Sequence, residues 1–400
     1  VSTEGDPIWA RVLGLPNSQI VFAASINGQV FSYTNKATNT APPGTFSGYQ
    51  TFPGDQAETY SLALAPNGAI GHAFVGSDND DPNDVFFRSS VDGGLTWTPK
   101  VKCWDWNEAT DSLGCLRGVS MVFGNNNEPY VAFNVSTLTA AGFFPGLPSS
   151  IRVWSPNVNG GVAKIIASDA TVPFFPNEGA TTDAFLPICR PAIGRSSSGN
   201  ALFVAFTATT NQIGSDTSRY YAGWFAHSVN NGTSWQAPER MTPPTPLRDY
   251  RFVSISPTSN VSGNICKVQM LIQSDSLAGT HVNGSPIGSG YAVGITTDVN
   301  ITGINTVSSV VPGDFSLKQN FPNPFNPTTA IRFDMKKSSN VTLKVYNAQG
   351  QEVATLINNE VVSPGTKEVT FGASNLSSGI YFYTLFAGDF KETKKMMLIK

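Results

Sequence analysis

The sequence predicts an all-β protein that combines a five-bladed β-propeller, with six blades as the alternative, and a C-terminal Ig-like β-sandwich. Two observations predict the propeller. Hairpins of alternating apolar and polar residues follow one another along the first three quarters of the chain, and they recur at intervals close to sixty residues. A proline-rich junction and a change of charge near residue 313 mark the start of the second part. We therefore predict domains at residues 1–313 and 314–400.

Composition supports a large folded core and narrows the classes of partner. Hydrophobic residues make up 40% of the 400-residue chain, and charged residues only 13%. This balance differs from that of disordered, coiled-coil or collagen-like chains. The formal net charge of −3 argues against nucleic acid as a partner, because phosphate binding needs clustered Lys and Arg. No apolar run reaches the roughly 18 residues of a membrane-spanning helix, so no transmembrane segment is expected. No nucleotide-binding motif occurs either, so no cofactor is expected.

The propeller prediction depends on two alternating series of hairpins. The first series has successive starts that are 57, 73 and 61 residues apart, at Tyr60, Arg117, Arg190 and Arg251. The second series lies between them, with starts at Asp84, Ser149, Tyr221 and Gly290, and a ninth hairpin starts at Ile20. Four strands in about sixty residues are typical of a propeller blade. Nine hairpins make four and a half blades, so a late strand around Thr306–Val311 is expected to complete the ring.

The second series contains a recurrent turn motif. One copy matches the pattern S-x-D-x-G-x-x-W at Ser90, Asp92, Gly94 and Trp97. Another copy has Asn in place of Asp, at Ser228, Asn230, Gly232 and Trp235. The motif resembles the Asp box of sialidase-like propellers. There the acidic side chain accepts backbone hydrogen bonds, Gly supplies a positive φ and Trp packs beneath the turn. The resemblance implies a propeller fold and a structural role, away from any active site.

The segment after the junction has a different charge balance and a more specific pattern. Residues 314–400 contain ten Lys and Arg against seven Asp and Glu, whereas the whole chain contains 25 against 28. Alternation predicts strands at Ile331–Met335, Val341–Tyr346, Glu352–Ile357, Glu368–Phe371, Ile380–Phe386 and Thr393–Ile399. The segment opens with N-F-P-N-P-F-N-P at Asn320–Pro327 and continues with V-Y-N-A-Q-G-Q at Val345–Gln351. It ends with S-G-I-Y-F-Y at Ser378–Tyr383 and K-K-M at Lys394–Met396.

These motifs closely resemble the C-terminal sorting domain of the type IX secretion system. The resemblance implies contact with the type IX secretion machinery and export across the outer membrane of a Gram-negative bacterium. The protein is then expected in the medium or on the outer cell surface.

The four cysteines allow two interpretations. Two disulfides, Cys103 with Cys115 and Cys189 with Cys266, would suit an exported protein. The alternative is four buried free thiols.

The candidate binding residues are the arginines that open three hairpins of the first series. If those strands are the innermost ones, Arg117, Arg190 and Arg251 meet at one mouth of the propeller and bind a carboxylate by forked hydrogen bonds. This resembles sialidases, which use an arginine triad and a Tyr–Glu nucleophilic pair; Tyr60 and Glu58 would be the candidates here. The sialidase R-I-P element is absent. In the alternative interpretation, each arginine pairs with a local carboxylate.

A dense run of acidic side chains also suggests a metal site. Oxygen ligands at Asp78, Asp80 and Asp84 could hold Ca²⁺, although Asp and Asn are also ordinary turn residues.

Three functional hypotheses follow from these features. The first is an exported, non-catalytic platform that binds a partner such as a glycan. The second is a related protein that assembles with itself into an extracellular filament or sheath. The third is a secreted glycoside hydrolase of the sialidase type.

Overall fold

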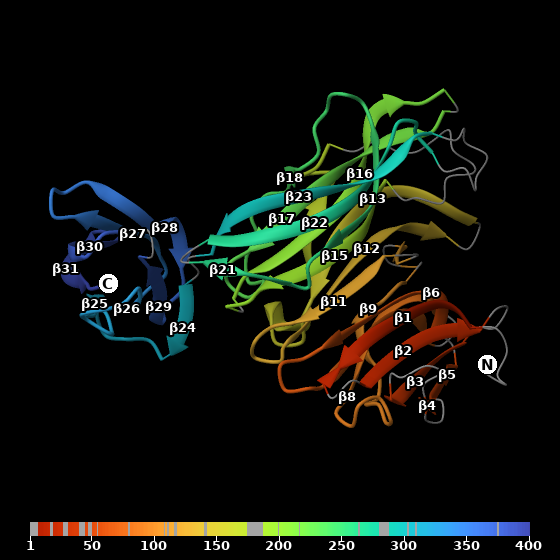
Figure 1. The fold of residues 1–400 in the computed structure, drawn as a ribbon, viewed down its shortest axis with the longest axis horizontal. Helices are drawn as coiled ribbons and strands as arrows, with labels where there is room; N and C mark the ends of the chain where they lie inside the picture. Colours follow the sequence, from red (N-terminus) through yellow and green to blue (C-terminus); the bar gives the residue numbers. More distant parts are fainter. Residues whose placement is uncertain are drawn as a thin grey trace. The chain divides into compact units, whose positions relative to one another are not determined.

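The computed structural model describes the chain except for residues 1–6, 17–18, 27–30, 40–44, 47–49, 54, 79–80, 108, 110–111, 116–117, 140–141, 174–186, 199, 216, 263–264, 280–287, 302–303, 309 and 374–375. The described chain is all-β and forms seven antiparallel sheets (Figure 1). Among the described residues, the one helical element longer than a single residue is a 3-10 turn, η2 (Asn159–Gly161). Over the same residues, no helix has the length and apolar character needed to cross a membrane.

The chain divides into two compact units. The first contains Val1–Arg195, Leu202–Thr258 and Gln269–Thr296, and the second contains Ser196–Ala201, Ser259–Val268 and Thr297–Lys400.

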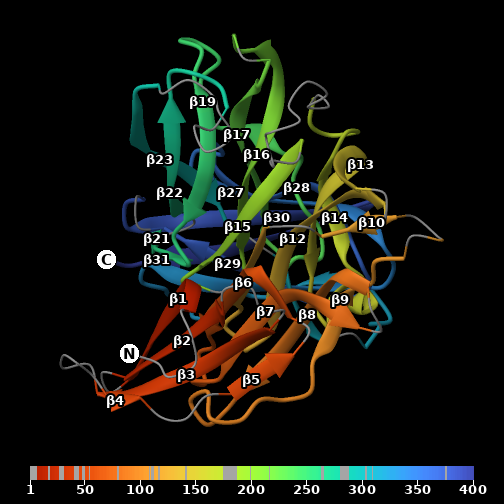
Figure 2. The ribbon, with the colours of Figure 1, turned by 90° about the vertical axis from the view of Figure 1, so that its right-hand side faces the viewer.

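Five sheets follow one another from Pro7 to Asn300 (Figure 2). The first sheet contains β1 (Pro7–Leu15), β2 (Gln19–Ile26), β3 (Phe31–Asn39), β4 (Thr45–Phe46) and β5 (Gln50–Pro53). The second contains β6 (Asp55–Leu64), β7 (Ile70–Asp78), β8 (Asp81–Ser90) and β9 (Val101–Trp104). The third contains β10 (Leu113–Gly114), β11 (Val119–Phe123), β12 (Pro129–Thr139), β13 (Gly142–Trp154) and β14 (Lys164–Ser168).

The last two sheets of this series continue the pattern. The fourth contains β15 (Ile188–Ser196), β16 (Leu202–Ile213), β17 (Arg219–Ser228), β18 (Glu239–Arg240) and β20 (Thr258–Ser259). The fifth contains β19 (Asp249–Ile255), β21 (Val261–Ser262), β22 (Ile265–Asp275) and β23 (Gly290–Asn300). In the second sheet the order is β6-β7-β8-β9, so each strand pairs with its neighbour in sequence. The predicted hairpins therefore form the sheets.

The third sheet is buried on both faces because successive side chains of a strand point in opposite directions. Phe133 of β12 packs in a core that includes Phe87 of the second sheet. Tyr130, three residues earlier on the same strand, packs in a core that includes Phe206 of the fourth sheet. The second, third and fourth sheets are thus packed face to face through two separate apolar cores.

Two loops between third and fourth strands have the same hydrogen-bond network. Ser90 Oγ accepts from the Gly94 N–H (2.8 Å), and Asp92 Oδ1 accepts from the N–H groups of Leu95 (3.0 Å) and Thr96 (2.9 Å). Burial alone raises the pKa of Asp92, but hydrogen bonds from Thr96, Ser90 and Leu95 outweigh it and lower the pKa to about 2. Gly94 has φ +91°, which a residue with a Cβ rarely adopts. These bonds satisfy the backbone of the turn without a further strand.

The second loop repeats this arrangement with an amide. Ser228 Oγ accepts from the Gly232 N–H (3.0 Å), and Asn230 Oδ1 accepts from the Ser234 N–H (2.9 Å). Trp235 packs against the core between the third and fourth sheets.

Trp97 at the end of the first loop lies beside a buried histidine. The rings of Trp97 and His72 have centroids 5.7 Å apart, and His72 is fully buried. Arg88 Nε donates a hydrogen bond to His72 Nδ1 (3.1 Å), so this nitrogen acts as an acceptor and carries no proton. Burial, and then the charge of Arg88, hold the pKa of His72 well below its usual range. His72 is therefore neutral in the folded protein.

Because His72 stays neutral only when folded, stability should depend on pH. Below the ordinary histidine pKa of about 6.5, the unfolded chain takes up a proton that the native protein does not. We expect the free energy of unfolding to be constant above about pH 6.5 and to fall by roughly 1.4 kcal/mol per pH unit below it. Urea unfolding at about pH 8 and about pH 5.5 measures this loss. In His72→Gln most of this loss of stability should disappear. A smaller loss should remain because of His227, whose pKa burial also lowers. An unchanged slope in the variant would contradict this assignment.

The two remaining sheets enclose one core in the second unit. One sheet has the order β24-β29-β26-β25 and the other β28-β27-β30-β31. Their strands are β24 (Ile304–Ser308), β25 (Ser316–Leu317), β26 (Thr328–Met335), β27 (Ser339–Asn347), β28 (Glu352–Val362), β29 (Gly365–Gly372), β30 (Gly379–Ala387) and β31 (Phe390–Leu398). The six strands predicted after residue 328 are all present. Both sheets contribute to the core, for example Ile331 and Phe371 from one and Val345 and Tyr383 from the other.

The late strand expected to complete the propeller ring belongs to this core instead. β24 pairs antiparallel with β29, where Ile304 faces Val369 and Thr306 faces Lys367. The expectation was wrong because this strand found its hydrogen-bond partner in the C-terminal sheets.

The proline-rich opening motif of this unit is bonded to its last strand. Asn320 is buried, and its Nδ2 donates to Thr329 Oγ1 (2.9 Å), while its N–H donates to the Tyr383 hydroxyl (2.8 Å). Phe325 forms a bridge with the last strand, donating to Met397 O (2.9 Å) and accepting from the Ile399 N–H (3.0 Å). The motif thus fastens the start of the unit to the end of the chain.

The predicted disulfides are absent from the structure. All four cysteines are buried free thiols. Cys189 Sγ lies 3.6 Å from Thr207 Oγ1, and Cys266 Sγ lies 3.5 Å from Ser259 O. Burial raises the pKa of Cys103, Cys115 and Cys266, the last to about 11. Each thiol packs as a small apolar group, which corrects the pairing of Cys103 with Cys115 and of Cys189 with Cys266.

Candidate functional site

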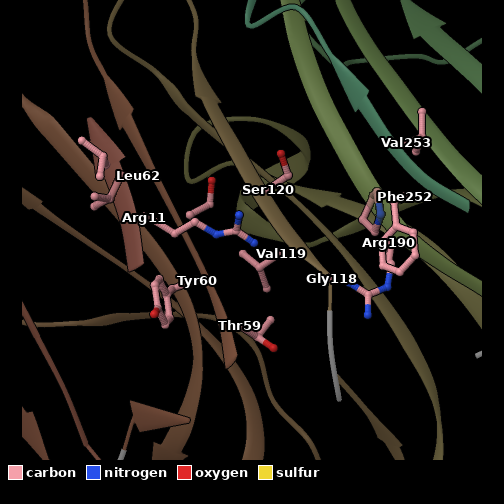
Figure 3. Close-up of a pocket in the computed structure, with 13 residues that line it drawn as sticks. Arg11, Thr59, Tyr60, Leu62, Gly118, Val119, Ser120, Arg190, Phe252 and Val253 are labelled. Atoms are coloured by element: carbon pink, nitrogen blue, oxygen red, sulfur yellow. The ribbon is translucent and has the colours of Figure 1, made fainter. Parts of the chain in front are cut away.

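The candidate site is a cavity of about 540 Å³ in the first unit. One strand of each of the first five sheets contributes to its wall, together with the residue before β11 (Figure 3). These strands are β1, β6, β11, β15 and β19, and we call them the leading strands. The lining residues are Arg11, Val12, Thr59, Tyr60, Ser61, Leu62, Gly118, Val119, Ser120, Arg190, Pro191, Phe252 and Val253. This volume is in the range of ordinary small-molecule sites.

The lining combines positive charge, hydroxyl groups and one aromatic face. Arg11 is exposed in the cavity and extends from β1 towards its middle (Figure 3). Arg190 lies on another wall, with its guanidinium carbon 4.9 Å from the centre of the Phe252 ring. No carboxylate occurs among the described side chains that line the cavity. The described wall is therefore suited to an anionic group.

Interrupted strand pairing shapes this wall. The register of β15 with β16 shifts between Cys189 and Ala192, and that of β19 with β22 shifts between Arg251 and Ser254. At these bulges Arg190 has φ 52° and Phe252 has φ 54°. Left-handed backbone is uncommon at residues other than glycine, and bulges redirect side chains at functional sites. The bulges bring Arg190 and Phe252 to equivalent places on neighbouring strands.

Adjacent leading strands are also tied together by serines. The Met121 N–H of β11 donates to Ser61 Oγ of β6 (3.2 Å), and the Ile193 N–H of β15 donates to Ser120 Oγ of β11 (3.1 Å). The same kind of bond thus joins two successive pairs of sheets at the cavity wall.

The structure brings some of the predicted site residues together and separates others. Tyr60 and Arg190 both line the cavity. Arg251 does not: it is buried, its Nε donates to Asp249 Oδ2 (2.6 Å), and its guanidinium carbon lies 4.4 Å from the centre of the Tyr221 ring. Arg117 lies outside the described residues, and the Glu58 side chain is also outside them. Arg251 therefore follows the alternative interpretation, in which each arginine pairs with a local carboxylate.

The bulges explain why aligning the arginines by sequence failed. Arg251 pairs with Gln273 just before its bulge, and the equivalent residue of the fourth sheet is Cys189, which faces Thr207. Arg190 is one residue further along, in the left-handed position that Phe252 occupies on β19. A shift of one residue moves a side chain to the other face of a strand.

Most of the lining residues were not predicted, and Arg11 and Phe252 are the two that matter most for binding. Arg11 lies in the middle of β1 and is followed by the apolar Val12 and Leu13, and this charged residue within an apolar stretch is the signal that could have identified it. Phe252 had no signal in the sequence, because only the bulge turns it towards the cavity.

The predicted calcium loop is not assembled by the residues that can be described. Asp84 is fully buried and paired with Lys102 Nζ (3.0 Å), and it accepts from the Trp106 N–H (2.7 Å). Burial raises the pKa of Asp84 despite these bonds. Asp80 and the side chain of Asp78 lie outside the described part of the chain. Within that part, no group of three His, Cys, Asp or Glu side chains is placed to hold a metal ion.

Comparison with known proteins identifies the end of the chain. Residues 319–400 match the family described as "Secretion system C-terminal sorting domain". The chain carries a sorting domain of the type IX system, which directs secretion to the cell surface or the extracellular space in Bacteroidetes. No curated protein matches the sequence significantly.

Several solved structures are similar to the chain at low sequence identity. The α-L-arabinanase of Penicillium chrysogenum, complexed with arabinobiose, is 9% identical over 93% of this chain and 94% of its own, with a TM-score of 0.41. The α-L-arabinofuranosidase of Podospora anserina is 10% identical over 75% and 94%, with a TM-score of 0.36. The exo-β-1,3-galactanase of Phanerochaete chrysosporium is 10% identical over 91% and 92%, with a TM-score of 0.33.

Proposed function

We propose that this is an exported extracellular protein whose first unit binds an anionic saccharide in the cavity and does not cleave it. The observation that carries the proposal is the presence of Arg11 and Arg190 on the wall of one cavity whose described lining has no acidic side chain. Guanidinium groups bind carboxylates through planar, charge-assisted hydrogen bonds. A ligand with a carboxylate would neutralise the charge that this wall concentrates.

The other lining residues favour a sugar over a simple anion. Hydroxyl groups of Thr59, Ser61 and Ser120 can exchange hydrogen bonds with sugar hydroxyls, and Phe252 offers an apolar face for a ring. Phe252 is 45% exposed, so part of its ring beside Arg190 is accessible. A uronic acid has the required carboxylate, hydroxyls and an apolar C–H face of its ring in one unit.

Binding without hydrolysis follows from the chemistry of the described wall. Glycosidases commonly need a pair of carboxyl groups on either side of the bond that they cleave. Tyr60 is present, but the described lining offers no such pair. Glycan cleavage is therefore the second outcome that the binding experiment must examine, with Glu58 as the residue to vary.

The wall also supports a more specific description of the fold. We infer that the five sheets up to Asn300 are the five blades of a β-propeller, because all five contribute to one cavity. We also infer that the C-terminal sheets form an Ig-like sandwich, which begins at or before β24 and so earlier than the predicted division into residues 1–313 and 314–400. The Asp-box identity of the two turns is part of this proposal, supported by their matching hydrogen bonds.

Assembly into filaments stays a prediction, for which electron microscopy of the extracellular fraction is the test.

Calorimetric titration of the full chain with trigalacturonate tests the proposed function. We expect Arg11→Met and Arg190→Met each to weaken binding at least about tenfold, since each removes a charge-assisted contact worth roughly 1.5–3 kcal/mol. Arg195→Met is the matched control, because Arg195 is on the same strand as Arg190 but does not line the cavity. Its affinity should equal that of the parent protein.

Two results would overturn the proposal. The first is equal affinity in all three variants, which would place the ligand elsewhere. The second is the appearance of shorter oligosaccharides during the titration that Glu58→Gln abolishes, which would make the protein a hydrolase.

A further inference from the structure

A buried asparagine stands directly behind the cavity wall. Asn134 lies on β12, and none of its side chain is exposed. Neither its Oδ1 nor its Nδ2 has a hydrogen-bond partner among the described residues. Its backbone N–H, in contrast, is bonded to Cys115. The orphaned groups are thus both ends of one side-chain amide.

Such an amide is unusual in a protein core. Burying a polar group without a partner costs free energy, and nearly all buried polar side chains in native proteins are paired. The same strand shows the normal case two residues further on, where Ser136 Oγ lies 2.6 Å from Ser149 Oγ. An unpaired buried polar group in a native protein calls for an explanation, and a functional role is one.

Gly118 connects this amide to the cavity. It lines the cavity and has φ +95°. A Cβ at this position would lie 2.4 Å from Asn134 Oδ1 and 3.1 Å from the backbone N and Cα of Arg190. The amide, the bare Gly118 backbone and the strand that carries Arg190 therefore meet at one point of the wall. Figure 3 shows Gly118 at the part of the wall next to Val119 and Arg190. Since Gly118 has no side chain, only its backbone separates the amide from the cavity.

We propose that Asn134 determines which saccharide the cavity accepts, by bonding a ligand hydroxyl that approaches over Gly118. This inference rests on the proposed function and deepens it. A hydroxyl group both donates and accepts, as the free Nδ2 and Oδ1 of the amide require. The hydroxyl would sit beside the carboxylate held by Arg190, an arrangement that uronic acids provide. Sites built to bond a hydroxyl strongly reject analogues that lack it.

Asn134→Leu separates this role from a structural one. Leucine has nearly the shape of asparagine and removes both orphaned atoms, so the thermal midpoint of the ligand-free protein should stay the same or rise. Affinity for trigalacturonate should fall at least about tenfold. Asn134→Ala, which leaves more space, should lower affinity as well, even if leucine does not fit the site. A purely structural asparagine would give the opposite pattern, with a lower midpoint and unchanged affinity.

Asn83→Leu is the matched control. Asn83 is also buried, and its Oδ1 has no partner in the described part of the chain, but it does not line the cavity. Its substitution should leave affinity unchanged.

The outcomes distinguish the two proposals. Binding that Arg190→Met weakens but both Asn134 variants preserve would overturn the role of Asn134 alone. If the parent protein does not bind trigalacturonate, the proposed function is overturned, and so is the proposal that Asn134 bonds a hydroxyl of this sugar.

Discussion

Phe325→Ala is expected to lower the free energy of unfolding of the C-terminal unit by about 4 kcal/mol, because it empties a ring-sized space in the core. Phe325 is 2% exposed, and its ring centroid lies 6.0 Å from that of Phe371. Its backbone bonds to the last strand are unaffected by the substitution, so the loss measures packing alone. Hydrogen exchange of the full chain, read at the β31 amides by mass spectrometry, measures the change.

Phe321→Ala is the control within the same motif. Phe321 is 80% exposed, so its removal should change stability by less than about 0.5 kcal/mol. Equal protection losses in the two variants would show that Phe325 is not an anchor of the core. The comparison also gives the N-F-P-N-P-F-N-P motif a physical meaning, since only the second phenylalanine is buried.

Gly194→Ala is expected to destabilise the first unit by about 3 kcal/mol through overpacking. A Cβ at Gly194 would lie 2.3 Å from the carbonyl oxygen of Ser256, which follows β19. A backbone oxygen cannot move aside as the end of a side chain can, and the Ser256 N–H is already bonded to Gln269 O (2.9 Å). Urea unfolding followed by tryptophan fluorescence reports on this unit, because all seven tryptophans precede residue 236.

Gly14→Ala provides the matched comparison for Gly194. Gly14 also lies on a leading strand, β1, but a Cβ there would meet nothing within 4 Å. We expect no loss of stability, or a small gain from the lower entropy of the unfolded chain. If Gly194→Ala is as harmless as Gly14→Ala, then β15 and β19 do not approach each other as the structure has them, and the shared cavity wall fails with them.

Strand positions were easiest to predict from the sequence where one residue in two is buried, as in β22 and in several strands of the C-terminal sheets. β22 shows this most simply, since its residues alternate between exposed and buried almost to its end. The same alternation located all six strands after residue 328. Partners of strands were harder to predict, as β24 shows: its alternation identified a strand near Thr306, but nothing local specified that β29 would be its partner.

The candidate site was predictable only in part, for a reason that lies in the backbone. The sequence singled out Tyr60 and Arg190, and both of them line the cavity. The bulges were not visible in the sequence, because they arise from the way in which neighbouring sheets meet. Because of the bulges, Arg190 corresponds in position to Phe252, and Arg251 corresponds to Cys189. This is why one predicted arginine, Arg190, lies in the cavity, whereas Arg251 is buried against Asp249.

A crystal structure of the full chain grown with trigalacturonate would show directly whether the cavity binds the sugar. We expect the sugar in the cavity, with a carboxylate in hydrogen-bond reach of Arg11 or Arg190, a ring against Phe252 and a hydroxyl at the Asn134 amide. A trisaccharide bound on another surface, or in the cavity with its carboxylates turned away from both arginines, would contradict it.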